Sequence, residues 1–177
     1  ANIDGVDASK DGDIHPTESL TGIPREPDAI AWVDDEHLAT ANEGDWKGGT
    51  RGWTIFATDG EVIWDAGNSI EELANAYGLH NEKRAGKKGP EIEGPAVAEI
   101  GGVRYAFVAS ERSNFVAVYN VNDPANPTFE QLLFTTNGPE GILPIPDRGI
   151  LAVSSEADDA SARVRSAVNL LSLIHIS

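Results

Sequence analysis

The chain has 177 residues, of which 40% are hydrophobic and 24% charged, so it has enough apolar material for one domain and too much for a chain disordered throughout. Its 29 acidic and 13 basic residues give a formal charge of -16, which repels nucleic acids and anionic lipid, so we expect no nucleic-acid partner. The absence of cysteine excludes disulfides and thiolate sites, and no apolar run approaches the roughly 20 residues of a membrane span.

The first 25 residues form an acidic lead-in. Five residues with oxygen-bearing side chains fall at positions 1, 3, 5, 7 and 12 of a calcium loop: Asp7, Ser9, Asp11, Asp13 and Glu18. Only six residues precede Asp7, and Pro16 would interrupt a helix on the other side, so the flanking helices of an EF-hand are not expected. The segment is predicted to be either a calcium loop without helices or a solvated acidic lead-in.

Most of the remaining chain favours β-strands, because alternating apolar residues and turn pairs outnumber helical patterns. Trp53–Thr58 and Glu61–Asp65 flank Asp59-Gly60, a pair that suits the positive φ angles of a hairpin turn. Four consecutive antiparallel strands are predicted further on, at Val97–Ile100, Val103–Ser110, Phe115–Val121 and Thr128–Phe134.

One short helix is predicted between these regions. Asn68 is its expected N-cap, Glu71 stands at the capping-box position, and Gly78 ends the helix. Its apolar face is formed by residues at helical spacing: Ile70, Leu73, Ala74 and Tyr77. The next stretch, Asn81–Gly89, carries four basic residues and is predicted to be a solvated loop or, alternatively, a phosphate-binding segment.

An internal repeat is the most informative feature, because self-similarity at about 45 residues is typical of propeller blades. Each copy carries one carboxylate at the start of an expected strand and a second at the end of the next strand. These pairs are Asp28 with Glu43, Glu93 with Glu111, and Glu140 with Glu156. The predicted fold is all-β, a partial β-propeller of two four-stranded blades and part of a third, with one helical insertion.

The predicted organisation has six parts. They are an acidic lead-in (1–25), a first blade (26–66), a helical insertion with a basic loop (67–92), a second blade (93–137), a partial third blade (138–170) and a tail (171–177). The tail resembles one reading frame of a sequencing-library adapter, the alternative being a natural apolar tail. Because a propeller closes with 4 to 8 blades, the chain is expected to be a truncated fragment of a longer protein. Trp32, Trp46, Trp53 and Trp64 are expected to pack between blades, the alternative for Trp46 being that it lines a pocket.

The repeat places its carboxylates at one edge of the predicted sheets. Adjacent strands joined by a short turn run antiparallel, so the start of one lies beside the end of the next. We therefore predict that the six carboxylates share one mouth of the propeller, where crowding raises their pKa values or requires a hard cation. The alternative is that each is solvated separately at its own hairpin edge.

Arginine and histidine are the remaining residue types to consider for a functional site. Arg112 directly follows Glu111 and is the best cationic candidate for a phosphate or carboxylate ligand, the alternative being that it neutralises nearby glutamates. His15, His37 and His80 show no zinc-like pairing and are expected at the surface or in turns.

Several short motifs between Asp7 and Val168 resemble the choice-of-anchor I family, secreted β-propeller proteins often labelled alkaline-phosphatase-like. The motifs are Asp7-Ala8-Ser9 with Asp11-Gly12, Glu26-Pro27-Asp28-Ala29-Ile30, Ala41-Asn42-Glu43-Gly44-Asp45, Gly89-Pro90-Glu91-Ile92-Glu93-Gly94, Glu111-Arg112 and Gly138-Pro139-Glu140-Gly141. The resemblance implies an extracytoplasmic bacterial protein that is secreted, periplasmic or attached to the cell surface.

Two functions from different classes are compatible with these features. The first is a metal-dependent phosphoesterase, in which the carboxylates hold calcium and a second hard ion, iron or magnesium, while Arg112 stabilises charge on a small phosphorylated substrate. This activity is expected of the full-length protein rather than of the fragment. The second is a non-catalytic, calcium-stabilised module that binds an extracellular ligand or acts as a scaffold. Fold alone does not decide between them.

Overall fold

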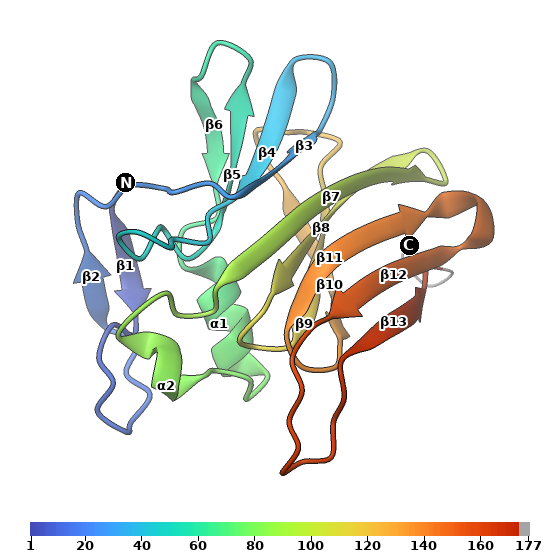
Figure 1. The fold of residues 1–177 in the computed structure, drawn as a ribbon. Helices are drawn as coiled ribbons and strands as arrows, with labels where there is room; N and C mark the ends of the chain where they lie inside the picture. The colour runs from blue at the N-terminus through green and yellow to red at the C-terminus, as the bar shows by residue number, and fades with distance from the viewer. Residues whose placement is uncertain (174–177) are drawn as a thin grey trace.

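The structure is a computed structural model that describes residues 1–173, and it is all-β apart from two short helices and one 3-10 turn (Figure 1). Its strands form four antiparallel sheets, and within each sheet neighbouring strands are consecutive in sequence. The sheets comprise β1 (Ile3–Val6) and β2 (Glu18–Leu20); β3 (Ala29–Trp32), β4 (His37–Ala41), β5 (Trp53–Ala57) and β6 (Val62–Asp65); β7 (Ile92–Ile100), β8 (Val103–Ser110), β9 (Phe115–Asn120) and β10 (Thr128–Phe134); and β11 (Pro139–Ile145), β12 (Ile150–Ser155) and β13 (Ala167–Ser172).

Local turn chemistry explains the hairpins that the sequence predicts. The β5–β6 hairpin is confirmed, with Gly60 at a φ of 92° in its turn. The four consecutive strands are also confirmed as β7 to β10. Ile100 pairs with Val103 across Gly101 and Gly102, whose φ angles of 61° and 82° fit a two-residue hairpin turn. Strand β7 begins at Ile92, earlier than predicted.

The β7–β10 sheet is buried on both faces. Along β8, Ala106 and Val108 face a core shared with β3–β6 and the helical insertion. The alternate residues Tyr105, Phe107 and Ala109 face a second core shared with β12 and β13. This period of two follows from the alternation of side chains along a strand. The β7–β10 sheet therefore lies between two other sheets.

The first strands of the three larger sheets lie next to one another. Strand β7 contacts β3 on one side and β11 on the other, as Figure 1 shows. Residues 1–173 form no closed barrel or propeller, so the observed fold is all-β with several antiparallel sheets. Within these residues, no helix has the length and apolar character that crossing a membrane requires.

The end of the described chain joins the third large sheet. Leu171 and Ser172, at the start of the predicted tail, belong to β13 and pair with Leu151 and Ile150 of β12. Leu173 is 2% exposed and packs in the second core. The rest of the predicted tail, residues 174–177, lies outside the described residues.

The helical insertion consists of α1 (Ser69–Ala76) and α2 (Glu82–Ala85). Helix α1 confirms the predicted helix, but the capping-box prediction is wrong. The side chain of Asn68 donates to Gly5 O and to Glu72 Oε1 instead of capping the helix. Glu71 is fully buried and binds the guanidinium of Arg51, so it is not available to the helix N-terminus.

The tryptophans divide into two groups. Trp53 and Trp64 pack against each other and against Tyr119, as expected for packing between sheets. Trp32 and Trp46 are 62% and 79% exposed, so the packing prediction is wrong for these two, and Trp46 instead lines a pocket as the alternative predicted. Trp32 ends the short strand β3, and Trp46 lies in the turn after β4, where Lys47 stacks on its ring.

Candidate cation-binding site

The carboxylates of the internal repeat lie near strand ends at the first two strands of each large sheet. Three stand just before or at the beginning of β3, β7 and β11, namely Asp28, Glu93 and Glu140. Three come after β4, β8 and β12, namely Glu43, Glu111 and Glu156. Backbone hydrogen bonds extend the strand pairing to these ends: Asp28 N donates to Ala41 O, and Glu156 N donates to Gly138 O. The strand pairing thus brings the two carboxylates of a copy to one edge.

Five of these carboxylates form two groups that share Glu93; we call them the Glu93 cluster. Ligand oxygens of Asp28, Glu43 and Glu93 all lie within 4.8 Å of one another, as do those of Glu93, Glu111 and Glu140. Calcium holds its oxygens at 2.3–2.6 Å, which allows two ligands of one ion to be up to about 5 Å apart. The spacing of both groups therefore suits a calcium-sized ion.

Glu156 lies close to the Glu93 cluster without joining either group. Its charge raises the pKa of Glu111 and of Glu140, so it is within electrostatic reach of both. Its own side chain is exposed. The structure thus brings five of the six predicted carboxylates together and leaves the sixth at the edge.

Glu93 is the most perturbed carboxylate of the cluster. The residue is 5% exposed, and the described residues give its carboxylate no hydrogen bond and no ion pair. Burial, followed by the charges of Glu140, Glu43 and Glu111, raises its pKa to about 8. Burial and the charge of Glu91 likewise raise the pKa of Glu111 to about 7. Glu43 and Glu111 have basic partners, but Glu93 has none among the described residues, so charge on the Glu93 carboxylate is disfavoured unless a cation is bound.

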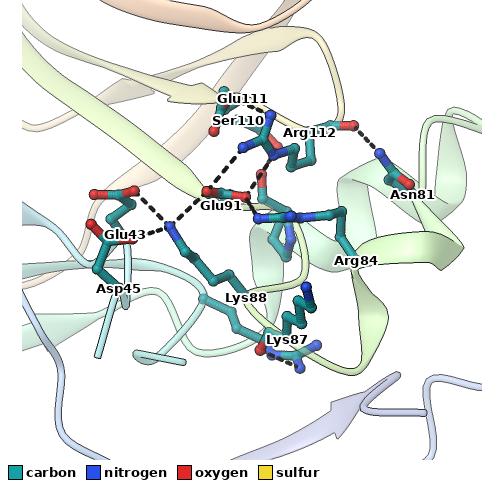
Figure 2. Close-up of polar contacts among 12 residues, drawn as sticks. Glu43, Asp45, Asn81, Arg84, Lys87, Lys88, Glu91, Ser110, Glu111 and Arg112 are labelled. Atoms are coloured by element: carbon teal, nitrogen blue, oxygen red, sulfur yellow. Dashed lines mark hydrogen bonds and ion pairs between the residues drawn. The ribbon is translucent and has the colours of Figure 1, made fainter. Parts of the chain in front are cut away.

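A set of basic side chains borders the cluster around the buried carboxylate of Glu91 (Figure 2). Lys88 Nζ lies 2.7 Å from both Glu43 Oε1 and Glu91 Oε1, and it also contacts Asp45. Arg84 donates to Glu91 Oε2 at 2.6 Å. Burial alone would raise the pKa of Glu91, but hydrogen bonds from Arg112, Lys88 and Arg84 lower it to about 2.

These contacts correct the prediction that residues 81–89 form only a solvated loop. Part of the segment is helix α2, and both Arg84 and Lys88 point at carboxylates. Lys83 and Lys87 are exposed. Two of the three acidic partners of Lys88, Glu43 and Asp45, lie more than 40 residues away, so the sequence did not indicate these contacts.

Arg112 connects the buried carboxylate of Glu91 to Glu111 of the Glu93 cluster. Its Nε donates to Glu91 Oε2 at 2.7 Å, and its Nη1 lies 2.5 Å from Glu111 Oε1. Its side chain is 31% exposed. In this arrangement the guanidinium neutralises two glutamates, and a direct contact with a phosphate remains a prediction.

Three of the five predicted ligands of the N-terminal loop, Asp7, Ser9 and Glu18, are joined by hydrogen bonds, and the other two are exposed. Asp7 is fully buried, and its carboxylate accepts hydrogen bonds from Ser9 N and His15 N. Glu18 accepts from Ala8 N and Ser9 Oγ. Asp11 and Asp13 are exposed, and among residues 1–173 neither belongs to a group of metal-ligating side chains. Calcium binding by this loop remains a prediction.

Two residues near this loop were missed as candidates. His80 lies in the connection between α1 and α2, but its side chain is 3% exposed, so it is not a surface histidine. His80 and Glu82 lie beside Asp7, more than 70 residues away in sequence. No short motif connects such distant positions, and burial of an isolated histidine has no sequence pattern of its own.

Comparison with known proteins finds one family model that matches part of the chain. Residues 46–124 match the model of the choice-of-anchor I domain. This segment contains Glu93 and Glu111 of the Glu93 cluster together with Lys88, Glu91 and Arg112. No curated protein and no solved structure matches the chain. Choice-of-anchor domains are typically associated with the cell surface or the extracellular space, and the match supports an extracellular, surface-associated module.

Proposed function

We propose that this chain is an extracytoplasmic module that binds calcium through the Glu93 cluster. The observation that carries the proposal is the pair of carboxylate groups sharing Glu93, whose own carboxylate has no partner among the described residues. All of the ligand atoms are carboxylate oxygens, which favour hard ions such as calcium and magnesium over zinc or copper. One ion, or two ions bridged by Glu93, would neutralise the cluster.

Cation binding would join the three large sheets to one another. Asp28 and Glu43 belong to the sheet of β3, Glu93 and Glu111 to the sheet of β7, and Glu140 to the sheet of β11. We further propose that these sheets are blades of a propeller, because β3, β7 and β11 lie side by side as inner strands of successive blades do. Calcium at the cluster would then hold neighbouring blades together at one mouth.

A metal-dependent phosphoesterase is the second candidate function. The observation in its favour is Arg112, a partly exposed guanidinium bound to Glu111 at the edge of the Glu93 cluster. A cation held there would polarise a phosphoryl oxygen, and Arg112 would stabilise charge developing on the phosphate. However, Arg112 already binds two glutamates, so we favour the non-catalytic binding or scaffold module.

The phosphoesterase alternative is tested with p-nitrophenyl phosphate in the presence of calcium, magnesium or iron. The scaffold proposal predicts no hydrolysis above that of the free metal ions. Metal-dependent hydrolysis that is lost in both Glu93→Gln and Arg112→Lys would establish the phosphoesterase instead. The two variants separate the metal ligand from the residue that would contact phosphate.

Calcium titration calorimetry tests the proposed site. The unmodified chain is expected to bind calcium with a Kd on the order of 10⁻⁴–10⁻³ M, the range of extracellular modules. Glu93→Gln should weaken binding by about 10- to 100-fold, since it removes the ligand shared by both groups. Glu99→Gln is the matched control, because Glu99 lies on the same strand with an exposed side chain. Equal calcium heats for Glu93→Gln and the unmodified chain would refute the proposal.

A further inference from the structure

A second group of ligating side chains lies outside the Glu93 cluster, where the N-terminal segment meets the helical insertion. Ligand atoms of Asp7, His80 and Glu82 all lie within 4.8 Å of one another. Asp7 directly follows β1, His80 lies between α1 and α2, and Glu82 begins α2. Three segments of the chain therefore place one nitrogen and two carboxylate ligands around one point.

The imidazole of His80 points its Nε2 at both carboxylates without bonding to either. Nε2 lies 3.7 Å from Asp7 Oδ2 and 3.7 Å from Glu82 Oε2. These distances are too long for hydrogen bonds. The side chain is 3% exposed, and among the described residues Nε2 is a buried atom with no hydrogen-bond partner, as is Glu82 Oε2. Buried polar atoms are normally satisfied, so two such atoms facing each other point to a shared ligand.

The two carboxylates are held in place by the backbone of the N-terminal loop. Asp7 Oδ2 accepts a hydrogen bond from His15 N at 2.9 Å. Glu82 Oε1 accepts one from Gly12 N at 2.9 Å, which leaves Oε2 directed toward His80. Such outer hydrogen bonds orient the ligands of metal sites. The N-terminal loop, whose side chains have the spacing of a calcium loop, therefore orients these two carboxylates through its backbone amides.

We propose that Asp7, His80 and Glu82 bind a borderline divalent transition metal, with zinc as the best fit. A zinc ion about 2.1 Å from each ligand in tetrahedral geometry separates its ligands by about 3.4 Å, close to the observed spacing. An imidazole ligand selects zinc, iron or nickel over calcium and magnesium, which distinguishes this site from the Glu93 cluster. The ion would fasten the N-terminal loop to the helical insertion.

A pocket lies beside two of the three proposed ligands. The pocket has a volume of about 470 Å³, and its lining includes His80, Glu82, Lys83 and Arg112. Three protein ligands leave one position of a tetrahedral site for water. This site shares no residue with the Glu93 cluster, so the inference is independent of the proposed function.

Zinc binding to the chain after dialysis against EDTA tests the inference. Competition with a chromophoric chelator should report one zinc ion whose affinity falls by at least about 10-fold in His80→Gln. His37→Gln is the matched control, because the ring of His37 pairs with Asp34 at a separate location. Glu93→Gln should retain this zinc ion, which separates the site from the Glu93 cluster. In long-range ¹⁵N spectra, zinc should shift the Nε2 resonance of His80 and not those of His37.

Two results would overturn the inference. One is the absence of zinc binding by the unmodified chain, and the other is unchanged affinity in His80→Gln. If His80→Gln does not fold, Glu82→Gln replaces it, because this side chain is 21% exposed and tolerates the change more readily. Unchanged zinc affinity in Glu82→Gln together with an unshifted His80 resonance would then exclude the site.

Discussion

Replacing Glu71 by Ala should lower the free energy of unfolding by about 3–5 kcal/mol, because it leaves the buried guanidinium of Arg51 without its carboxylate partner. Arg51 is 2% exposed and Glu71 is fully buried. Arg51 also donates to Asp7 O at 2.7 Å and to Ala85 O at 2.5 Å, so the pair connects β1, α1 and α2. Loss of Glu71 would loosen all three attachments.

Urea unfolding at pH 7 measures this effect, and Glu72→Ala is the control. Both substitutions introduce Ala at adjacent positions of α1, so helix propensity changes equally. Glu72 is not buried, and its replacement should change the free energy of unfolding by less than about 0.5 kcal/mol. Similar stabilities for the two variants would show that the Arg51–Glu71 pair does not hold the insertion in place.

Calcium-free protein should lose about 3–4 kcal/mol of stability between pH 5 and pH 8, and calcium should restore most of it. The pKa of Glu93 is raised from 4.5 in the unfolded chain to about 8 in the folded protein, mainly by burial. A carboxyl with a raised pKa contributes its full stability below pH 4.5, and this contribution is lost as the pH rises through about 8. Glu111, with its pKa raised to about 7, acts in the same direction.

Glu91 has the opposite dependence on pH. Its hydrogen bonds to Arg112, Lys88 and Arg84 outweigh burial and lower its pKa from 4.5 to about 2. Its contribution to stability is therefore present above pH 4.5 and is lost as the pH falls toward 2. The stability of the calcium-free protein should then be greatest near about pH 5.

Unfolding in EDTA and in excess calcium at pH 5, 6.5 and 8 tests these opposing effects. Glu93→Gln should flatten the loss on the alkaline side, and Glu99→Gln should retain it. Calcium at about 100 times its Kd should add about 2.7 kcal/mol at pH 8 to the unmodified chain and much less to Glu93→Gln. If Glu93→Gln leaves the dependence of stability on pH unchanged, the alkaline loss of stability does not come from Glu93.

Local and repeated features were accessible from the sequence. Asp59-Gly60 identified the β5–β6 hairpin, because glycine adopts the positive φ that its turn needs. The internal repeat identified residues that converge, because antiparallel pairing fixes which strand ends are neighbours. The five residues of the Glu93 cluster come from three sheets, yet each was found from its place in a copy of the repeat.

Features that depend on tertiary packing were not accessible. Glu71 fits a capping box by its spacing, but Arg51 competes for its carboxylate in the folded chain. The group of Asp7, His80 and Glu82 combines residues more than 70 positions apart, and spacing alone assigned Asp7 to a calcium loop. In the first case the local motif lost to a partner that only the packing of the insertion against the N-terminal segment supplies, whereas calcium binding by the loop of Asp7 stays a prediction.

The role of the Glu93 cluster is decided by locating the bound ion. Crystals of the chain grown in calcium, measured at long wavelength, give the anomalous scattering of calcium itself. We predict an anomalous peak within about 2.3–2.6 Å of a Glu93 carboxylate oxygen, with Asp28 and Glu43 or Glu111 and Glu140 completing the ligands. Calcium found only at other positions, with the Glu93 carboxylate free of it, would contradict the proposed cation-binding role.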